Sequence, residues 1–172
     1  MKKYIYLISP QKINGENFYK QLNKLLETKK VKYFQLRLKK ISDSNLIKIS
    51  KKLKKILKKN NVKFLINDKP LIAKKVNADG CHLGQDDMNI NAARKILKKK
   101  IIGITCNNSY QKAKLAIKNK ADYIALGAFN NSKTKKIKHK ASIKDLKKIR
   151  KLTNKPIIAI GGINQYNYKK LL

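Results

Sequence analysis

Short apolar runs alternate with longer lysine-rich stretches along the whole chain. The runs favour β-branched and aromatic residues, which are typical of buried strands. They occupy seven segments: residues 4–8, 33–38, 63–66, 81–83, 101–105, 123–126 and 157–160. The stretches between them repeat apolar residues at helical spacing, most clearly on the single stripe formed by Leu46, Ile49, Leu53, Ile56 and Leu57. Seven strands alternating with helices predict an α/β fold with a parallel sheet.

The regular alternation favours a (β/α) barrel of the TIM type. No GxGxxG motif follows the first apolar run, which argues against a dinucleotide-binding fold. No Pro-rich or Ser-rich linker interrupts the chain, so we expect a single domain over residues 1–172. Asp79 and Asp122 each stand just before a predicted strand, and we expect them to serve the turns that lead from helix to strand.

The chain carries 44 Lys and Arg against 9 Asp and Glu, a formal net charge of +35. Specific base readout favours arginine, yet Arg37, Arg94 and Arg150 are the only arginines. We therefore expect a solvated lysine surface that attracts small anions, and no specific nucleic-acid partner. The apolar runs are far shorter than the roughly 20 residues of a membrane span. Two isolated cysteines suit a reducing compartment, so we expect a cytoplasmic location and no membrane partner.

Active sites of (β/α) barrels lie at the carboxyl ends of the strands. The second predicted strand carries Gln35, Arg37 and Lys39, which period-two alternation places on one face. Two cations and an amide on one face predict a clamp for an oxyanion. The alternative is that these positions lie on the surface of an edge strand.

Acids follow the next two strands. Asp68 comes directly after Asn67 at the end of the third predicted strand, and Asp87 closes the sequence Gly84-Gln85-Asp86-Asp87 after the fourth. Carboxylates that face phosphates usually hold Mg²⁺, so we expect both to serve one Mg²⁺. The alternative is that Asp68 and Asp87 cap the following helices.

Two later loops have small and hydroxyl-bearing residues suited to phosphate oxygens. They are residues 127–136, which are also rich in lysine, and the pair Gly161-Gly162. An ordinary solvated loop and a plain tight turn are the alternatives. Cys106 follows Thr105 without a nearby histidine, and we interpret it as lining the site and not as a nucleophile.

These motifs together resemble the thiamine-phosphate synthase family over nearly the whole chain. The resemblance is carried by their order and spacing: QLRLK at 35–39, IND at 66–68, ADGCHLGQDD at 78–87, IGITCNN at 102–108, SKTK at 132–135 and AIGGI at 159–163. It implies a (β/α)8 barrel that joins hydroxymethylpyrimidine diphosphate to a thiazole phosphate, giving thiamine phosphate and pyrophosphate. The reaction would be a Mg²⁺-assisted, dissociative substitution by a transferase.

The resemblance also implies roles for individual residues. The diphosphate and pyrimidine would be bound by Gln35, Arg37, Lys39, Asn67 and Lys135. Asp68 and Asp87 would hold Mg²⁺, and the thiazole phosphate would be bound by Ser132, Thr134 and Gly162. Thr105, near the reacting carbon, and Lys135 would be the catalytic residues. Thr105 and Ser132 are departures, because the family usually has Ser and Thr at these positions.

Two other functions within the superfamily stay open. A thiazole tautomerase would need a histidine after the fifth strand, where Asn107 stands instead. A degenerate, non-catalytic phosphate-ligand-binding barrel is the second alternative. Only seven βα units are visible, so we expect a C-terminally incomplete barrel whose eighth unit is missing and whose open strand edges favour self-association.

Overall fold

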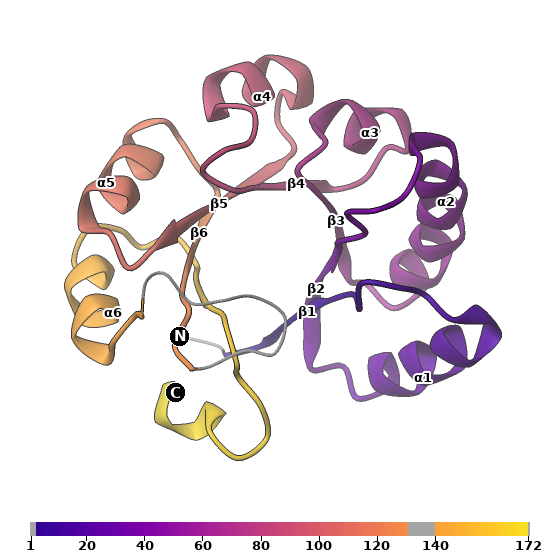
Figure 1. Ribbon diagram of the computed structural model, residues 1–172, viewed down its shortest axis with the longest axis horizontal. Helices are drawn as coiled ribbons and strands as arrows, with labels where there is room; N and C mark the ends of the chain where they lie inside the picture. The colour runs from indigo at the N-terminus through magenta and orange to yellow at the C-terminus, as the bar shows by residue number, and fades with distance from the viewer. Residues whose placement is uncertain (1–2, 131–139, 172) are drawn as a thin grey trace. The chain divides into compact units, whose positions relative to one another are not determined.

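The computed structural model describes residues 3–130 and 140–171. Strands and helices alternate along the chain, as Figure 1 shows. The elements are β1 (Ile5–Ile8), α1 (Gly15–Glu27), β2 (Val31–Leu36), α2 (Asp43–Lys59), β3 (Lys63–Asn67), α3 (Pro70–Lys75), β4 (Gly80–Leu83), α4 (Ile90–Leu97), β5 (Ile101–Asn107), α5 (Tyr110–Lys118), β6 (Tyr123–Leu126), α6 (Ile143–Arg150), β7 (Ile157–Ala159) and the 3₁₀ helix η1 (Tyr168–Leu171).

The chain forms two compact units. The first comprises Met1–His82 and Ala93–Ile101, and the second comprises Leu83–Ala92 and Ile102–Leu172. In the first unit β1, β2, β3 and β4 lie in that order, and each neighbouring pair is parallel. In the second unit β5, β6 and β7 are likewise parallel neighbours. The predicted parallel pairing is therefore confirmed within each unit, while the single domain stays a prediction.

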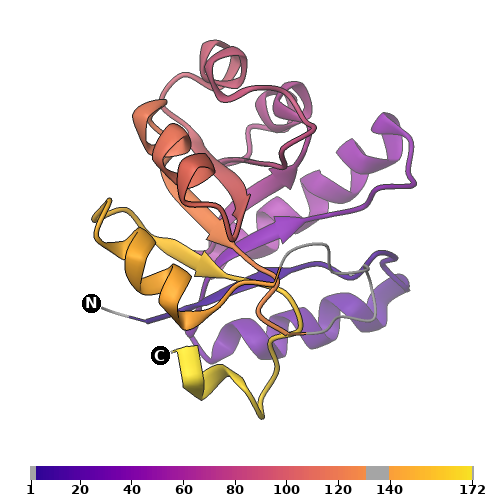
Figure 2. The same ribbon diagram turned by 60° about the vertical axis from the view of Figure 1, so that its left-hand side comes forward.

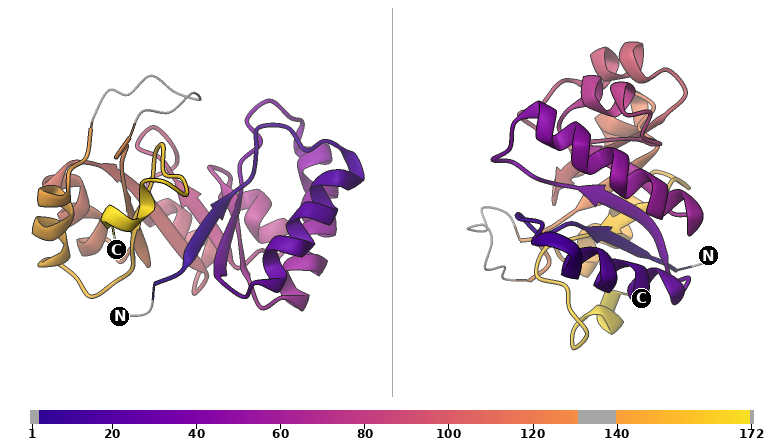
Figure 3. Two further views of the ribbon diagram at one scale, coloured as in Figure 1. Left: turned by 90° about the horizontal axis from the view of Figure 1, so that it is seen from below. Right: turned by 90° about the vertical axis from the view of Figure 1, so that its right-hand side faces the viewer.

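Helices cover the strands of each unit. In the first unit α1 and α2 lie along one face of the strands, as both views in Figure 3 show. In the second unit α5 and α6 pack against each other on one side of the strands (Figure 2). Within residues 3–130 and 140–171, no helix combines the length and the apolar character that crossing a membrane requires.

Helix α2 shows how the sequence specifies one of these elements. The Ser42 side chain accepts a hydrogen bond from the backbone N–H of Asn45 and so caps the first turn. Along the predicted stripe, Leu46, Leu53 and Leu57 are buried to 2% exposure or less. The lysines of α2 surround this stripe on the outer surface. The predicted amphipathic helix is confirmed.

Asp79, just before β4, and Asp122, just before β6, perform the same task two strands apart in the repeat. Asp79 Oδ2 accepts a hydrogen bond of 2.9 Å from the N–H of Phe64 in β3. Asp122 Oδ2 accepts one of 2.8 Å from the N–H of Ile102 in β5. Each carboxylate thus joins the start of one strand to the turn before the next strand, which confirms the structural role predicted for both.

The helices end in an unusual way. Helices α1 to α5 are each followed by a residue with φ between 50° and 62°, the left-handed region in which glycine is the common residue. Here these residues are Lys29, Asn61, Asn77, Lys98 and Lys120. Side chains other than Asn and Asp are disfavoured in that region, because Cβ approaches the following carbonyl oxygen. The lysine-rich composition therefore places backbone strain at helix ends.

Candidate active site

The first group of candidate residues lies in the first unit, at the end of β2. The strand stops at Leu36, two residues before the predicted end, so Arg37 and Lys39 lie in the following loop. Gln35 remains in the strand and is only 2% exposed. Its amide accepts a hydrogen bond of 3.2 Å from the Tyr6 hydroxyl and donates one of 2.5 Å to Oδ1 of Asn67. Two of the predicted diphosphate ligands, Gln35 and Asn67, are thus in direct contact.

The loop after β2 is tied to the end of β1 by Ser9. The Ser9 N–H donates to the Gln35 carbonyl at 2.9 Å. The Ser9 hydroxyl, on a side chain that is nearly buried, accepts from the N–H of Arg37 at 2.9 Å. These two bonds fix the backbone from which the Arg37 side chain extends. Neither Tyr6 nor Ser9 was among the residues predicted from the sequence.

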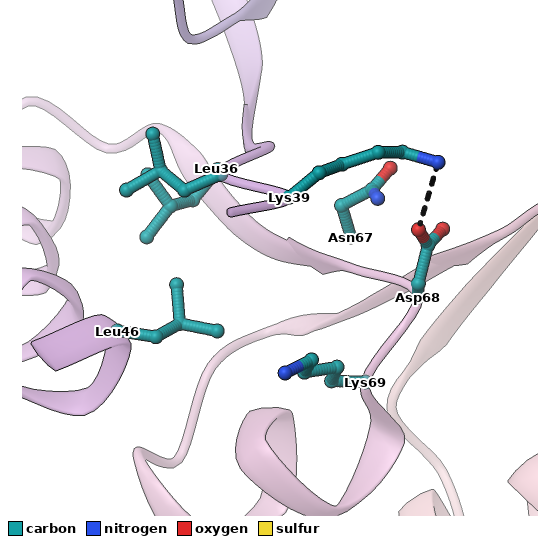
Figure 4. Close-up of a pocket in the computed structure, with 7 residues that line it drawn as sticks. Leu36, Lys39, Leu46, Asn67, Asp68 and Lys69 are labelled. Carbon is teal, nitrogen blue, oxygen red and sulfur yellow. Dashed lines mark ion pairs between the residues drawn. The ribbon is translucent and has the colours of Figure 1, made fainter. Parts of the chain in front are cut away.

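Lys39, Asn67 and Asp68 line one pocket of about 130 Å³. Figure 4 shows the Lys39 side chain passing over Asn67 to reach Asp68, and the Lys39 Nζ lies 3.5 Å from Asp68 Oδ2. The pocket has an apolar wall formed by Leu36, Leu38 and Leu46, and Lys69 completes its polar side. A cation, an amide and a carboxylate therefore share one opening, which suits a phosphate group and an accompanying metal ion.

The backbone of Asp68 turns sharply at the end of β3. Its φ is 63°, in the left-handed region, and its N–H donates to the His82 carbonyl at 2.8 Å. Asp is one of the few residue types that tolerate this conformation. Helix α3 begins after Lys69 with a proline in its first turn and has no side-chain cap. The N-cap residue of α3 is therefore Lys69 and not Asp68.

Asp87 lies in the second unit, in the loop between β4 and α4. Its Oδ2 accepts a hydrogen bond of 2.6 Å from the N–H of Gly84. A Cβ at position 84 would lie 2.8 Å from the same oxygen, so a side chain there would displace the carboxylate. The cap of α4 is Asn89, whose Oδ1 accepts from the N–H of Ala92 at 2.9 Å. The alternative that Asp87 caps α4 is therefore wrong.

Thr105 and the glycine pair belong to the second unit as well. Thr105 lies in β5, and its carbonyl accepts a hydrogen bond from the side-chain amide of Gln85, so the loop that carries Asp87 is fastened to this strand. Gly161 and Gly162 both have positive φ, at 92° and 62°. A Cβ on Gly161 would overlap Ala128, so only glycine fits there. Ser132, Thr134 and Lys135 lie outside the described residues.

Cys106 is buried, and burial raises the pKa of its thiol to about 12. The thiolate is the nucleophilic form of cysteine, and it is disfavoured at neutral pH when the pKa is this high. This agrees with the prediction that Cys106 is not a nucleophile.

The residues present suit magnesium. Within the described part of the chain, no three His, Cys, Asp or Glu residues gather as a closed metal site would require. Mg²⁺ is usually bound by only one or two carboxylates together with water and substrate phosphates. Asp68 and Asp87 are hard oxygen ligands of this kind, each fixed in a loop after a strand. Each of the two carboxylates, Asp68 in the first unit and Asp87 in the second, is therefore an oxygen ligand of the type that Mg²⁺ prefers.

Comparison with known proteins identifies the family. A family model described as thiamine monophosphate synthase matches residues 5–172. The thiamine-phosphate synthase of Pelagibacter ubique (strain HTCC1062) is 60% identical over 171 residues, which cover 99% of this chain and 83% of that protein. The thiamine-phosphate synthase of Fusobacterium nucleatum is 43% identical over 165 residues, covering 95% of this chain and 79% of that protein.

A solved structure agrees with the sequence relatives. The thiamine phosphate pyrophosphorylase of Pyrococcus furiosus superposes with a TM-score of 0.86 at 28% identity, over 98% of this chain and 79% of that one. The likeness confirms the predicted TIM-barrel-like α/β fold with seven parallel βα units. On the family match and these relatives together, the chain belongs to the thiamine-phosphate synthase family.

Proposed function

We propose that this protein joins hydroxymethylpyrimidine diphosphate to a thiazole phosphate and releases thiamine phosphate and pyrophosphate. Family membership supports the reaction. The observation that carries the assignment of residues is the opening shared by Lys39, Asn67 and Asp68, with Gln35 bonded directly to Asn67. Phosphorylated small molecules are the partners in this proposal, and two buried free cysteines suit the cytoplasmic location that it includes.

The diphosphate is assigned to Gln35, Arg37, Lys39 and Asn67, together with Lys135. Cationic and amide N–H donors bind phosphate oxygens most strongly when their geometry is fixed in advance. The Gln35–Asn67 hydrogen bond holds the two side-chain amides in position. The two hydrogen bonds of Ser9 hold the backbone at Arg37. The thiazole phosphate is assigned to Ser132, Thr134 and the backbone of Gly162.

Asp68 and Asp87 are the residues that we propose to hold Mg²⁺. When bound, the ion would supply positive charge that stabilises the departing pyrophosphate. The Lys39 ammonium, 3.5 Å from Asp68, belongs to the same charge arrangement. It can keep the Asp68 carboxylate in place before the ion arrives.

The reaction requires stabilisation of a leaving group more than it requires a nucleophilic side chain. In a dissociative substitution the C–O bond to the diphosphate breaks first, and the thiazole nitrogen then attacks the resulting pyrimidine methylene cation. Arg37 and Lys39 would bind the pyrophosphate as its negative charge develops. Thr105 is assigned to the surroundings of the reacting carbon, where the site must exclude water.

Mass spectrometry can test the proposal. The protein is mixed with both substrates and Mg²⁺, and we expect equal amounts of thiamine phosphate and pyrophosphate, lost when either substrate or Mg²⁺ is omitted. Arg37→Ala should lower turnover at least about tenfold more than Arg150→Ala, a difference of roughly 1.4 kcal/mol in the barrier. Arg150 is the matched control, because it is the last residue of α6 and its guanidinium donates to the carbonyl of Thr153 in the loop that follows.

Two outcomes would contradict this reading. Equal effects of the two arginine substitutions would remove Arg37 from the diphosphate clamp. If no thiamine phosphate formed but pyrophosphate still bound, the protein would be a non-catalytic phosphate-binding barrel.

A further inference from the structure

A chain of hydrogen bonds crosses three neighbouring strands of the first unit. It begins at the Tyr6 hydroxyl in β1, passes through the Gln35 amide in β2 and ends at Oδ1 of Asn67 in β3. The bonds measure 3.2 Å and 2.5 Å. Gln35, the middle member, is 2% exposed, so water cannot readily replace either bond. This series of hydrogen bonds is therefore a fixed part of the fold.

The order of donors and acceptors gives this series of hydrogen bonds a direction. A phenol hydroxyl donates more readily than it accepts, so Tyr6 favours the carbonyl oxygen of Gln35 on its side. The Gln35 nitrogen then faces Asn67 and donates to it, so the Asn67 oxygen is the atom turned inward. In the described part of the chain the Asn67 Nδ2 makes no hydrogen bond to protein, which leaves both of its N–H groups for a ligand.

The opposite arrangement would disfavour an anion. If the Gln35 amide were reversed, its oxygen would face Asn67, and the Asn67 amide would turn its own nitrogen inward. Its oxygen would then face the pocket that Asn67 lines with Lys39 and Asp68. An amide oxygen repels the oxygens of a phosphate, whereas an N–H group binds them.

We propose that Tyr6 is a positioning residue for the diphosphate substrate: it acts through Gln35 to hold the Asn67 amide with its nitrogen toward the phosphate. The inference rests on the proposed function for the assignment of Asn67. The Tyr6 ring is itself held by Tyr33, with ring centroids 5.8 Å apart and an interplanar angle of 22°. The hydroxyl therefore has a defined position from which to donate.

Tyr6→Phe removes the hydroxyl and keeps the ring on Tyr33. Binding of pyrophosphate with Mg²⁺ is measured by titration calorimetry, and we expect the dissociation constant to rise about three- to tenfold, the size of one net hydrogen bond. Tyr4→Phe is the matched control, because the Tyr4 ring also packs on Tyr33, at 5.6 Å. It should leave the dissociation constant within about twofold of the original value.

A double-mutant cycle separates positioning from direct contact. If Tyr6 acts through Asn67, Tyr6→Phe should change the dissociation constant less than about twofold once Asn67→Ala is present. An equal effect in both backgrounds would overturn the inference, because Tyr6 would then bind the anion itself or act through stability. No effect of Tyr6→Phe in the original chain would overturn it as well. No effect of Asn67→Ala would instead overturn the assignment of Asn67 in the proposed function, and the inference with it.

A second readout does not depend on affinity. The side-chain NH₂ signals of Asn67 can be identified by ¹⁵N NMR through their loss in Asn67→Ala. We expect them to shift when pyrophosphate is added to the original chain, and to shift less or to split in Tyr6→Phe. Unchanged behaviour in a folded Tyr6→Phe protein would show that the hydroxyl does not set the orientation of the amide.

Discussion

Glycine at two helix ends should stabilise the protein. Lys29 and Lys98 are exposed and have φ of 55° and 51°. A side chain in this region costs roughly 1–2 kcal/mol, and glycine avoids that cost but gives the unfolded chain more freedom, roughly 0.5–1 kcal/mol. The net gain is about 0.5–1 kcal/mol at each site. Because the sites end different helices, we expect their gains to add.

The free energy of unfolding of the double variant Lys29→Gly/Lys98→Gly should therefore be about 1–2 kcal/mol higher than that of the original protein. For a chain of this length the melting temperature should rise by about 2–8 °C. Urea unfolding and differential scanning calorimetry can measure both quantities. The Lys98 carbonyl, which accepts from Arg94, is kept because it belongs to the backbone.

The essential control is Lys29→Ala/Lys98→Ala. It removes the same two positive charges from a chain of net charge +35, but it keeps a Cβ in the left-handed region. We expect it to gain little or nothing. If the alanine variant were as stable as the glycine variant, relief of charge repulsion would explain the gain, and the argument from backbone strain would be refuted.

Three further predictions concern the site and the core. Ser9→Ala leaves the N–H of Arg37 without its acceptor, so it should lower the free energy of unfolding by about 1–3 kcal/mol in urea titrations. It should also weaken pyrophosphate binding. Unchanged binding would show that the hydrogen bond between Ser9 and the loop after β2 is not needed to position Arg37 for the anion. For Cys106, whose pKa is about 12 in the fold against an ordinary value of 9.0, stability should fall as pH rises from 9 towards 12 by up to about 1.4 kcal/mol per pH unit. Cys106→Ala lacks this slope, so subtracting its curve of stability against pH from that of the original chain should isolate it; equal slopes in both proteins would contradict the assignment. Gly161→Ala should cost about 1–3 kcal/mol more than Gly15→Ala, because both positions have positive φ but only a Cβ at 161 meets a neighbour; equal melting temperatures would contradict the steric argument.

Much of the fold could be predicted because the strands are buried on both faces and read as apolar runs. The error at the end of β2 has a clear cause. Leu38 is 8% exposed and continues the apolar alternation of the strand, although strand pairing has already ended at Leu36. Burial and strand pairing are different properties, and the sequence pattern reports the first of them.

The candidate site was predictable in part for a similar reason. Residues that follow parallel strands share one edge of the sheet, so chemistry-bearing residues such as Asn67 and Asp68 could be found from their positions. Tyr6 and Ser9 could not, because their contacts with Gln35 and Arg37 span 29 and 28 residues and depend on strand register. Nor could the sequence decide whether an acid capped a helix, which the hydrogen bonds of Gly84 and Asn89 resolve.

The left-handed backbone of Asp68 has a consequence for how this position can change over time. A replacement must suit both the turn, with φ of 63°, and the proposed metal ligand. Asn keeps the turn and loses the charge, whereas Glu keeps the charge but lacks the short side chain that eases this conformation. Substitutions at this position are therefore more easily tolerated when they keep the fold and lose the activity than when they keep the charge and disturb the turn. A relative that had lost the activity could keep this turn unchanged, and its backbone alone would not reveal the loss.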